Sequence, residues 1–298
     1  MYAAQHASGD PKPARRSSRS RSASRHSAPE RGKHDGTADD QVTRGPQGAG
    51  KVFLVGAGPG DPELLTVKAL RLIESAEAVV YDHLVGDEIV ALIPPAARKV
   101  YAGKEAGNHA LPQHETNALL VSLAREGLHV VRLKGGDPFI FGRGGEEMQA
   151  VLDAGFACEI VPGITAAAGA AACTGIPLTH RAHAQTLVFA TGHLKDDTVD
   201  LDWGALARPC QTVVIYMGLG ALEEICRQMI AHGLPAHTPA AVIHAATTSR
   251  QCGVHSTLAG LPAAVREAGI RTPALIMIGE VVALDPGVLL AQASTAGI

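Results

Sequence analysis

The 298-residue sequence predicts two α/β domains, the first with a mostly parallel sheet, preceded by a disordered tail. Three observations lead to this prediction. Short apolar runs alternate with segments of helical periodicity, glycine-rich turns follow the apolar runs, and a Pro-Gly break at residues 162–163 separates two such series. We place the tail at residues 1–50, the first domain at 51–164 and the second domain at 165–290.

The tail differs from the rest of the chain in composition. It is rich in Ser, Arg, Pro, Gly and Ala and nearly lacks aromatic and branched aliphatic residues, so it buries too little apolar surface to offset its ordering entropy. Residues 1–48 hold nine Lys and Arg against five Asp and Glu; because the whole chain carries −3, the remainder carries −7. A mildly acidic body argues against a nucleic-acid partner. RNA binding or organelle targeting by the Arg/Ser tail stays open as an alternative.

The elements of the first domain follow from apolar runs and helical spacing. Leu65, Ala69 and Leu72 share one helix face, and so do Leu119 and Leu123. In order, we expect a strand and glycine turn at 52–61, a helix at 64–75, a strand at 78–82, a helix at 88–93, a strand at 98–101, a helix at 115–126, a strand at 129–133, a helix at 145–154 and a strand at 158–161.

The second domain is predicted to begin with a helix of small residues and to continue as another α/β run. We expect this helix at 166–174, strands at 186–190, 211–216 and 239–244, helices at 223–231 and 261–268, and a final strand at 274–278 that runs on to residue 282.

Composition also bears on the environment of the protein. No charge-free apolar segment is long and unbroken enough to predict a membrane span. The five cysteines are scattered and form no CxxC pair, which indicates reduced thiols in a cytoplasmic protein. The 14 histidines show no ligand spacing, so we expect no metal.

The most informative segment is VRLKGGDPFIFGRGGEE at residues 131–147. An apolar strand leads into a glycine pair, an Asp-Pro step, an apolar trio and a second glycine cluster that contains Arg143. Glycine allows positive φ and close approach of a ligand to the backbone, and Arg143 indicates an anionic partner. The alternative is a plain strand-to-helix turn in which Glu146 and Glu147 favour a helix N-terminus.

A dinucleotide site is the other interpretation of the glycine turns. GAGPGD at residues 56–61 supplies the first two glycines of G-x-G-x-x-G, but the third position is Asp61, which would place a negative charge against a pyrophosphate. Pro59 and Pro62 also stiffen this turn. NAD(P) binding by an oxidoreductase is therefore disfavoured, and the chain contains no P-loop string.

Seven motifs in order identify a family resemblance. They are VGAGPGDPELLT at 55–66, VVYDHLV at 79–85, KGGDPFIFGRGGEE at 134–147, VPGITAA at 161–167, GIPLTHR at 175–181, TGH at 191–193 and YMG at 216–218. Together they resemble the tetrapyrrole methylases over about residues 52–282. The resemblance implies two α/β domains with the cofactor in a cleft between them, a homodimer, and S-adenosyl-L-methionine (SAM) as methyl donor.

The motifs resemble in particular the members that methylate uroporphyrinogen III at C2 and then C7, giving precorrin-2 for sirohaem, cobalamin or haem d1 synthesis. A rival within the family is a methylase of a later precorrin. Methyl transfer from a sulfonium needs no metal, and the protein contributes chiefly positioning. An extra N-terminal domain for oxidation and metallation does not fit in about 50 polar residues, so we expect methyltransferase activity alone.

The resemblance also assigns site residues. Cofactor contacts fall on Pro59, Gly135, Gly136, Asp137, Ile140, Thr165, Ala166, Met217 and Ala246. The proton acceptor and donor fall on Asp82 and Lys104, for which a strand-end cap and a solvated lysine are the alternatives; both roles require shifted pKa values. Glu105 stands where relatives often have Arg. Cations for a polycarboxylate substrate are expected among Lys104, Arg132, Lys134, Arg143 and Arg181, and Arg143 is a further catalytic candidate.

Overall fold

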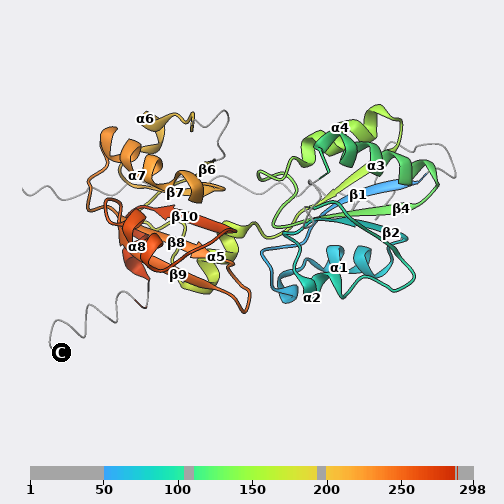
Figure 1. Ribbon diagram of the computed structural model, residues 1–298, viewed down its shortest axis with the longest axis horizontal. Coiled ribbons are helices and arrows are strands. Elements are labelled where there is room, and N and C mark those ends of the chain that lie inside the picture. The colour runs from blue at the N-terminus through green and yellow to red at the C-terminus, as the bar shows by residue number, and fades with distance from the viewer. Residues whose placement is uncertain (1–49, 104–110, 193–198, 286, 288–298) are drawn as a thin grey trace, which may run out of the picture. The chain divides into compact units, whose positions relative to one another are not determined.

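The computed structural model describes residues 50–103, 111–192, 199–285 and 287. Residues 1–49 of the predicted tail, Lys104 and Glu105 lie outside this part of the chain, whereas Gly50, placed at the end of the tail, is described and buried. The described residues form two lobes, each built on a five-stranded sheet (Figure 1). We call residues 50–161 the first lobe and residues 166–285 the second lobe.

The first lobe alternates strands and helices along the chain. Its elements are β1 (Lys51–Gly56), the 3-10 helix η1 (Pro62–Leu64), α1 (Val67–Glu74), β2 (Ala78–Tyr81), α2 (Asp87–Val90), β3 (Arg98–Tyr101), α3 (Gln113–Arg125), β4 (His129–Lys134), α4 (Gly144–Asp153) and β5 (Ala157–Val161). Helix α1 begins after Thr66, whose side chain accepts a hydrogen bond from the Ala69 N–H at 3.1 Å.

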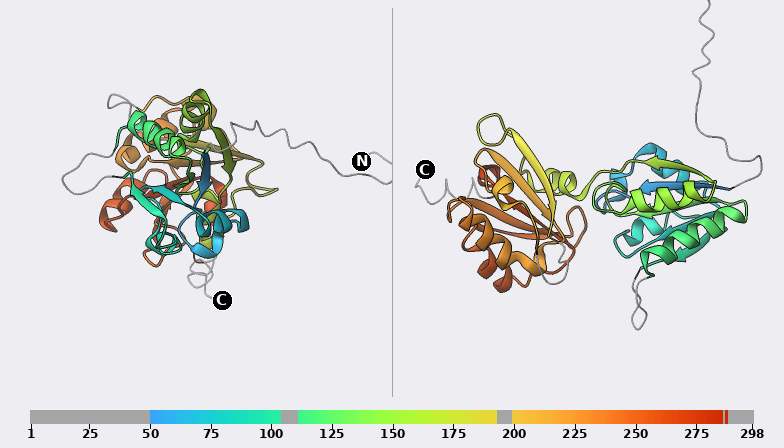
Figure 2. Two further views of the ribbon diagram at one scale, coloured as in Figure 1. Left: turned by 90° about the vertical axis from the view of Figure 1, so that its right-hand side faces the viewer. Right: turned by 90° about the horizontal axis from the view of Figure 1, so that it is seen from above.

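The sheet of the first lobe has the order β3-β2-β4-β1-β5, and every pairing in it is parallel. Val55 pairs with Leu133 on one side and with Val161 on the other, so three strands end at the same edge. Helices α1 and α2 cover one face and α3 and α4 the other (Figures 1 and 2). The predicted parallel sheet is confirmed, and β1 is a nearly continuous apolar run because both of its faces are covered.

The second lobe contains a mixed sheet with the order β6-β7-β10-β8-β9. Its elements are α5 (Ala166–Thr174), β6 (Thr186–Thr191), α6 (Trp203–Leu206), β7 (Gln211–Tyr216), η2 (Leu219–Ala221), α7 (Leu222–Ala231), β8 (Pro239–His244), β9 (Cys252–Thr257), α8 (Leu261–Glu267), β10 (Ala274–Ile278) and η3 (Glu280–Leu284). Strands β6 and β7 are parallel, whereas β10 is antiparallel to β7 and to β8, and β9 is antiparallel to β8.

Besides the short 3-10 helices, two elements of the second lobe are absent from the sequence prediction, namely β9 and α6. The predicted extension of the last strand to residue 282 is wrong, because β10 ends at Ile278 and η3 follows it. Strand β9 is an edge strand with three exposed and one half-buried residue in its first four, so it lacks the apolar run that marks a buried strand. Its stability comes from the ladder to β8, which a local pattern does not reveal. Helix α6 has four residues and is set by the Asp202 side chain, which accepts from the Ala205 N–H at 3.0 Å.

The helices of the described residues are too short or too polar for any of them to cross a membrane.

Candidate functional site

The glycine loops of the first lobe meet because parallel strands deliver their carboxyl ends to one edge of the sheet. The loop after β1 and the loop after β4 are joined by two backbone hydrogen bonds: Gly58 N–H donates to the Gly136 carbonyl at 3.2 Å, and Gly136 N–H donates to the Gly58 carbonyl at 2.7 Å. Both glycines have positive φ, +71° and +68°. The first two glycine motifs therefore form one backbone-lined surface.

Close packing explains why this junction needs glycine. A Cβ on Gly56 would lie 2.5 Å from the Gly163 nitrogen, and a Cβ on Gly163 would lie 2.2 Å from the Gly136 carbonyl oxygen. The backbones of three motifs, after β1, β4 and β5, thus touch with no room for a side chain. A Cβ on Gly135 would lie 2.7 Å from the Cβ of Leu84, which brings the segment after β2 into the same group.

Asp137 fixes this junction with both of its carboxylate oxygens. Oδ1 accepts from the Phe139 N–H at 2.8 Å, and Oδ2 accepts from the Gly163 N–H at 3.0 Å. The carboxylate therefore ties the loop after β4 to the loop after β5. Each oxygen keeps a second lone pair for another donor.

The motifs of the second lobe pack on each other in the same way. A Cβ on Gly192 would lie 2.5 Å from the Cα of Gly218, so the TGH and YMG glycines are in direct backbone contact. Met217, directly before Gly218, has φ of 54°, an uncommon conformation for a residue with a side chain, and it is 52% exposed. The loop after β8 has two more such residues, Ala245 and Thr247, with φ of 44° and 67°. Strained backbone of this kind concentrates at functional sites.

The remaining predicted cofactor contacts lie beside these loops. A Cβ on Gly169 of α5 would lie 2.6 Å from the ring of Pro59, and one on Gly60 would lie 3.5 Å from the carbonyl oxygen of Ala246. The Asp61 N–H donates to Thr247 Oγ1 at 3.2 Å.

Thr165 and Ala166 lie at the start of α5, and the hypothetical Cβ of Gly136 comes within 3.5 Å of the Ala166 nitrogen. Ile140 is half-buried in the glycine loop. The structure therefore places the predicted cofactor residues in neighbouring loops; whether they contact a cofactor stays a prediction.

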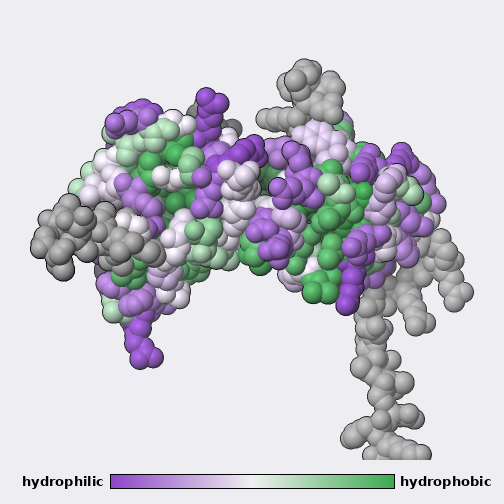
Figure 3. Space-filling model, turned by 90° about the horizontal axis from the view of Figure 1, so that it is seen from below, coloured by the Kyte–Doolittle hydropathy of each residue, from purple (hydrophilic) through white to green (hydrophobic). Residues whose placement is uncertain are grey.

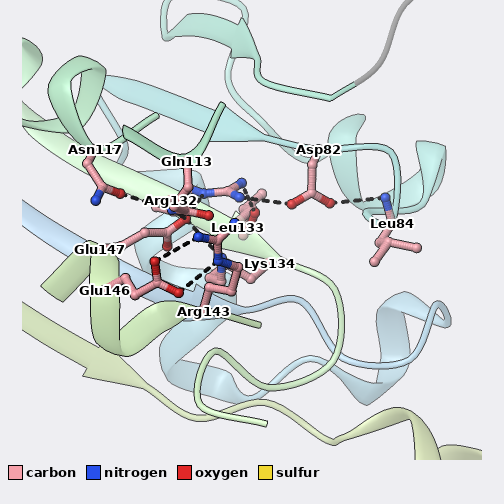
Figure 4. A network of polar contacts seen from close by, with 10 residues as sticks. All are labelled: Asp82, Leu84, Gln113, Asn117, Arg132, Leu133, Lys134, Arg143, Glu146 and Glu147. Atoms are coloured by element: carbon pink, nitrogen blue, oxygen red, sulfur yellow. Dashed lines mark hydrogen bonds and ion pairs between the residues drawn. The ribbon is translucent and has the colours of Figure 1, made fainter. Parts of the chain in front are cut away.

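Asp82 belongs to a buried polar network (Figure 4). Its Oδ2 accepts from Arg132 Nη2 at 2.9 Å and its Oδ1 accepts from the Leu84 N–H at 3.1 Å. Arg132 Nε in turn donates to Glu147 Oε1 at 3.1 Å, and Lys134 Nζ donates to the same oxygen at 3.0 Å. We call Asp82, Arg132, Lys134 and Glu147 the buried ion network.

Burial sets the properties of this network. The exposed fraction is 5% for Arg132, 4% for Lys134 and 0% for Glu147. Burial and the nearby Arg132 charge lower the pKa of Lys134. Arg132 and Lys134 were expected among the cations for substrate carboxylates. Buried and paired within the protein, they are not placed for that role, and the expectation is wrong for both.

Arg143 is exposed at the surface of the glycine loop. It has φ of 58° at the N-cap of α4, and its Nε and Nη2 donate to the two carboxylate oxygens of Glu146 at 2.8 and 2.7 Å. The hydrogen bond to Glu146 raises the pKa of Arg143. Arg181 is also exposed, so these two remain the described candidates for an anionic ligand.

Apolar side chains are unusually exposed around the same loops. Leu84, Phe139, Phe141 and Met217 are 48%, 52%, 37% and 52% exposed, and they are four of the six large hydrophobic residues in the exposed class among those described. Hydrophobic area reaches the surface of the first lobe in Figure 3 as well. Exposed apolar residues gathered at these motif loops indicate a binding site for a partly apolar ligand.

Glu147 is a site residue that was not predicted from the sequence. Glu146 and Glu147 both resemble acids at a helix start, but Glu147 precedes the fully buried Val151 by four residues and so shares its helix face. That spacing is the signal that could have separated the two.

A cavity of about 210 Å³ in the second lobe, lined by Arg208 and Glu280 among others, contains none of the candidate site residues. No group of three or more potential metal ligands occurs among the described residues.

Residues 51–262 match the family of Tetrapyrrole (Corrin/Porphyrin) Methylases. The chain belongs to this family. Similar curated proteins include the siroheme synthases of Methylobacillus flagellatus, 57% identical over 81% of this chain and 52% of that one, and of Methylococcus capsulatus, 59% identical over 79% and 50%. This chain thus spans about half the length of the curated relatives it matches.

Solved structures support the same fold. The uroporphyrin III C-methyl transferase of Thermus thermophilus is 41% identical, with a TM-score of 0.68 over 78% of this chain and 99% of that one; the same enzyme is also solved in complex with S-adenyl homocysteine. A cobalt precorrin-4 methyltransferase is 31% identical, with a TM-score of 0.70 over 78% and 95%. The predicted family and the predicted class of two α/β lobes are confirmed.

Proposed function

We propose that this chain is a SAM-dependent methyltransferase that methylates uroporphyrinogen III at C2 and then C7, giving precorrin-2. The observation that carries the proposal is the 41% identity to the Thermus thermophilus enzyme across nearly all of that chain. The siroheme synthase relatives support a place in the same chemistry. A later precorrin methylase is the second candidate, favoured by the similarity to the cobalt precorrin-4 enzyme.

The residues of the structure fit SAM. Gly135 and Gly136, both half-buried, present bare backbone on which a nucleoside can lie closely, and exposed Met217 offers an apolar contact for it. Pro59, Asp137, Ile140, Thr165, Ala166 and Ala246 complete the proposed contacts. When bound, SAM supplies a methyl group on a sulfonium, so the chain has to position the acceptor carbon in line with it.

Asp82 is proposed to take the proton that the macrocycle loses after methylation. Arg132 and the Leu84 N–H hold its carboxylate in a fixed orientation. Arg143 orients substrate carboxylates, for which it has to exchange its bond to the exposed Glu146. Lys104, the proposed proton donor, lies outside the described residues. We further propose a cytoplasmic homodimer with a domain boundary at residue 164, a cofactor cleft between the domains, and no metal, nucleic-acid or membrane partner.

The test is anaerobic incubation of the purified chain with uroporphyrinogen III and SAM, followed by product mass. A gain of two methyl groups supports the proposal. No gain, together with methylation of a later precorrin, would favour the second candidate. Asp82→Asn is expected to slow turnover and leave S-adenosyl-homocysteine (SAH) binding unchanged, and binding of NAD without SAH would contradict the whole assignment.

A further inference from the structure

Tyr216, the last residue of β7, supplies a hydrogen-bonding group to the first turn of α5. Thr165 is the N-cap residue of that helix, but its own side chain makes no capping hydrogen bond. The Tyr216 hydroxyl accepts from the Ala167 N–H at 3.1 Å and lies 2.6 Å from Thr165 Oγ1. Burial raises the pKa of Tyr216, so the phenol keeps its proton at neutral pH and can also donate. A helix start is thus capped by a residue about 50 positions away in the sequence.

The ring of Tyr216 makes a second connection. Its centroid lies 5.0 Å from that of Phe141 in the glycine loop and 5.7 Å from that of Phe189 in β6, distances typical of aromatic pairs. Phe141 itself has φ of 54° and is 37% exposed, and the ring of Tyr216 is its aromatic partner.

The backbone of Tyr216 makes the third connection. Its carbonyl accepts from the Gly192 N–H at 2.7 Å, and β7 is paired on both sides, with β6 and β10. Met217 follows in its strained conformation. Tyr216 is therefore fixed by the sheet, belongs to the YMG turn, and contacts the glycine loop and the start of α5. These three segments carry most of the proposed cofactor residues.

We propose that Tyr216 is a positioning residue of the cofactor site. Its hydroxyl sets the start of α5, and its ring holds the glycine loop through Phe141, so that the contacting atoms are arranged before SAM binds. This inference rests on the proposed function, and the role of Tyr216 is indirect because its hydroxyl is used by Thr165 and Ala167. Preorganisation of this kind lowers the cost of ordering the loops on binding.

The experiment is calorimetric titration of the full chain with SAH. Tyr216→Phe keeps the ring and removes the hydroxyl, and it is expected to raise the Kd for SAH about tenfold, the factor that 1.4 kcal/mol produces. Thr165→Val should raise the Kd as well. The double variant should raise the Kd by less than the product of the two single increases, because both changes remove the hydrogen bond between Thr165 and Tyr216.

Tyr81→Phe is the matched control, since Tyr81 also ends a strand and contacts an aromatic ring, that of Tyr101, but belongs to β2. It should leave the Kd unchanged. An unchanged Kd for Tyr216→Phe would overturn the inference, and so would a lowered melting temperature with an unchanged Kd, which would show a purely structural role. Absence of SAH binding by the wild-type chain would instead refute the proposed function, and this inference with it.

Discussion

Replacement of Glu147 by Ala tests the buried ion network most directly. Glu147 Oε1 accepts from Arg132 Nε at 3.1 Å, from Lys134 Nζ at 3.0 Å and from Gln113 Nε2 at 3.3 Å. The side chain is completely buried, so its removal leaves these three donors without the acceptor they share. Glu147 also joins three elements, since its partners lie on β4 and α3 while it lies on α4.

The expected loss in free energy of unfolding follows from the cations that Glu147→Ala leaves without their acceptor. Arg132 keeps Asp82 as a partner, whereas the Lys134 ammonium, 4% exposed, loses the acceptor it has in the structure. Removing one partner of a buried ion pair costs about 3–5 kcal/mol. Such a loss is a large part of the 5–15 kcal/mol by which a domain is typically stable. We therefore expect Glu147→Ala to bring the first lobe close to unfolding at moderate temperature.

The assay is urea unfolding, combined with hydrogen exchange of β4 and α4 to show which lobe responds. Glu146→Ala is the matched control, because Glu146 is the neighbouring acid on the same helix, is exposed, and pairs only with Arg143 among the described residues. It should unfold like the wild type. The deficit of Glu147→Ala should shrink as the pH rises towards about 10, because the buried Lys134, whose pKa is already lowered, can then release its proton.

Equal free energies of unfolding for Glu147→Ala and Glu146→Ala would refute this reasoning. Such a result would mean that burial of the carboxylate does not determine its contribution to stability. If the stability lost in Glu147→Ala did not change with pH, lost packing and not the Lys134 charge would be the cause of the destabilisation.

Three other experiments test separate parts of the fold. Thr212 is completely buried, and its hydroxyl has no hydrogen-bond partner among the described residues, so Thr212→Val should stabilise the chain by about 1 kcal/mol; a lower melting temperature would contradict this. In the native protein, exposed Cys173 should react with a thiol reagent at pH 8 while Cys226, whose burial raises its pKa to about 12, stays unmodified; peptide mass mapping checks both. The hydrogen bond from Lys51 lowers the pKa of Glu159, so this ion pair stabilises the fold above the ordinary carboxyl pKa and is lost as the pH falls through the lowered one. Glu159→Gln should accordingly cost less than about 1 kcal/mol at neutral pH and still less in acid, as thermal melts at several pH values would show.

Local sequence determined most of the elements. The predicted helix at 166–174 and strands at 98–101, 211–216 and 239–244 have the bounds found in the structure, because apolar periodicity and glycine or proline boundaries are properties of a few consecutive residues. The motifs likewise identified the family, and glycines in four of them, Gly56, Gly144, Gly163 and Gly192, are required by backbone contacts that exclude a Cβ.

Only the tertiary structure decided how charged and polar side chains are used. Arg132 and Lys134 are of the residue type expected for substrate-binding cations, yet in the structure they face Glu147 in the interior. Strand β9 and the contact of Tyr216 with α5 also became visible only in the fold. The physical reason is the same in each case: burial and partner choice depend on which distant segments the sheets bring together, and no window of the sequence contains that information.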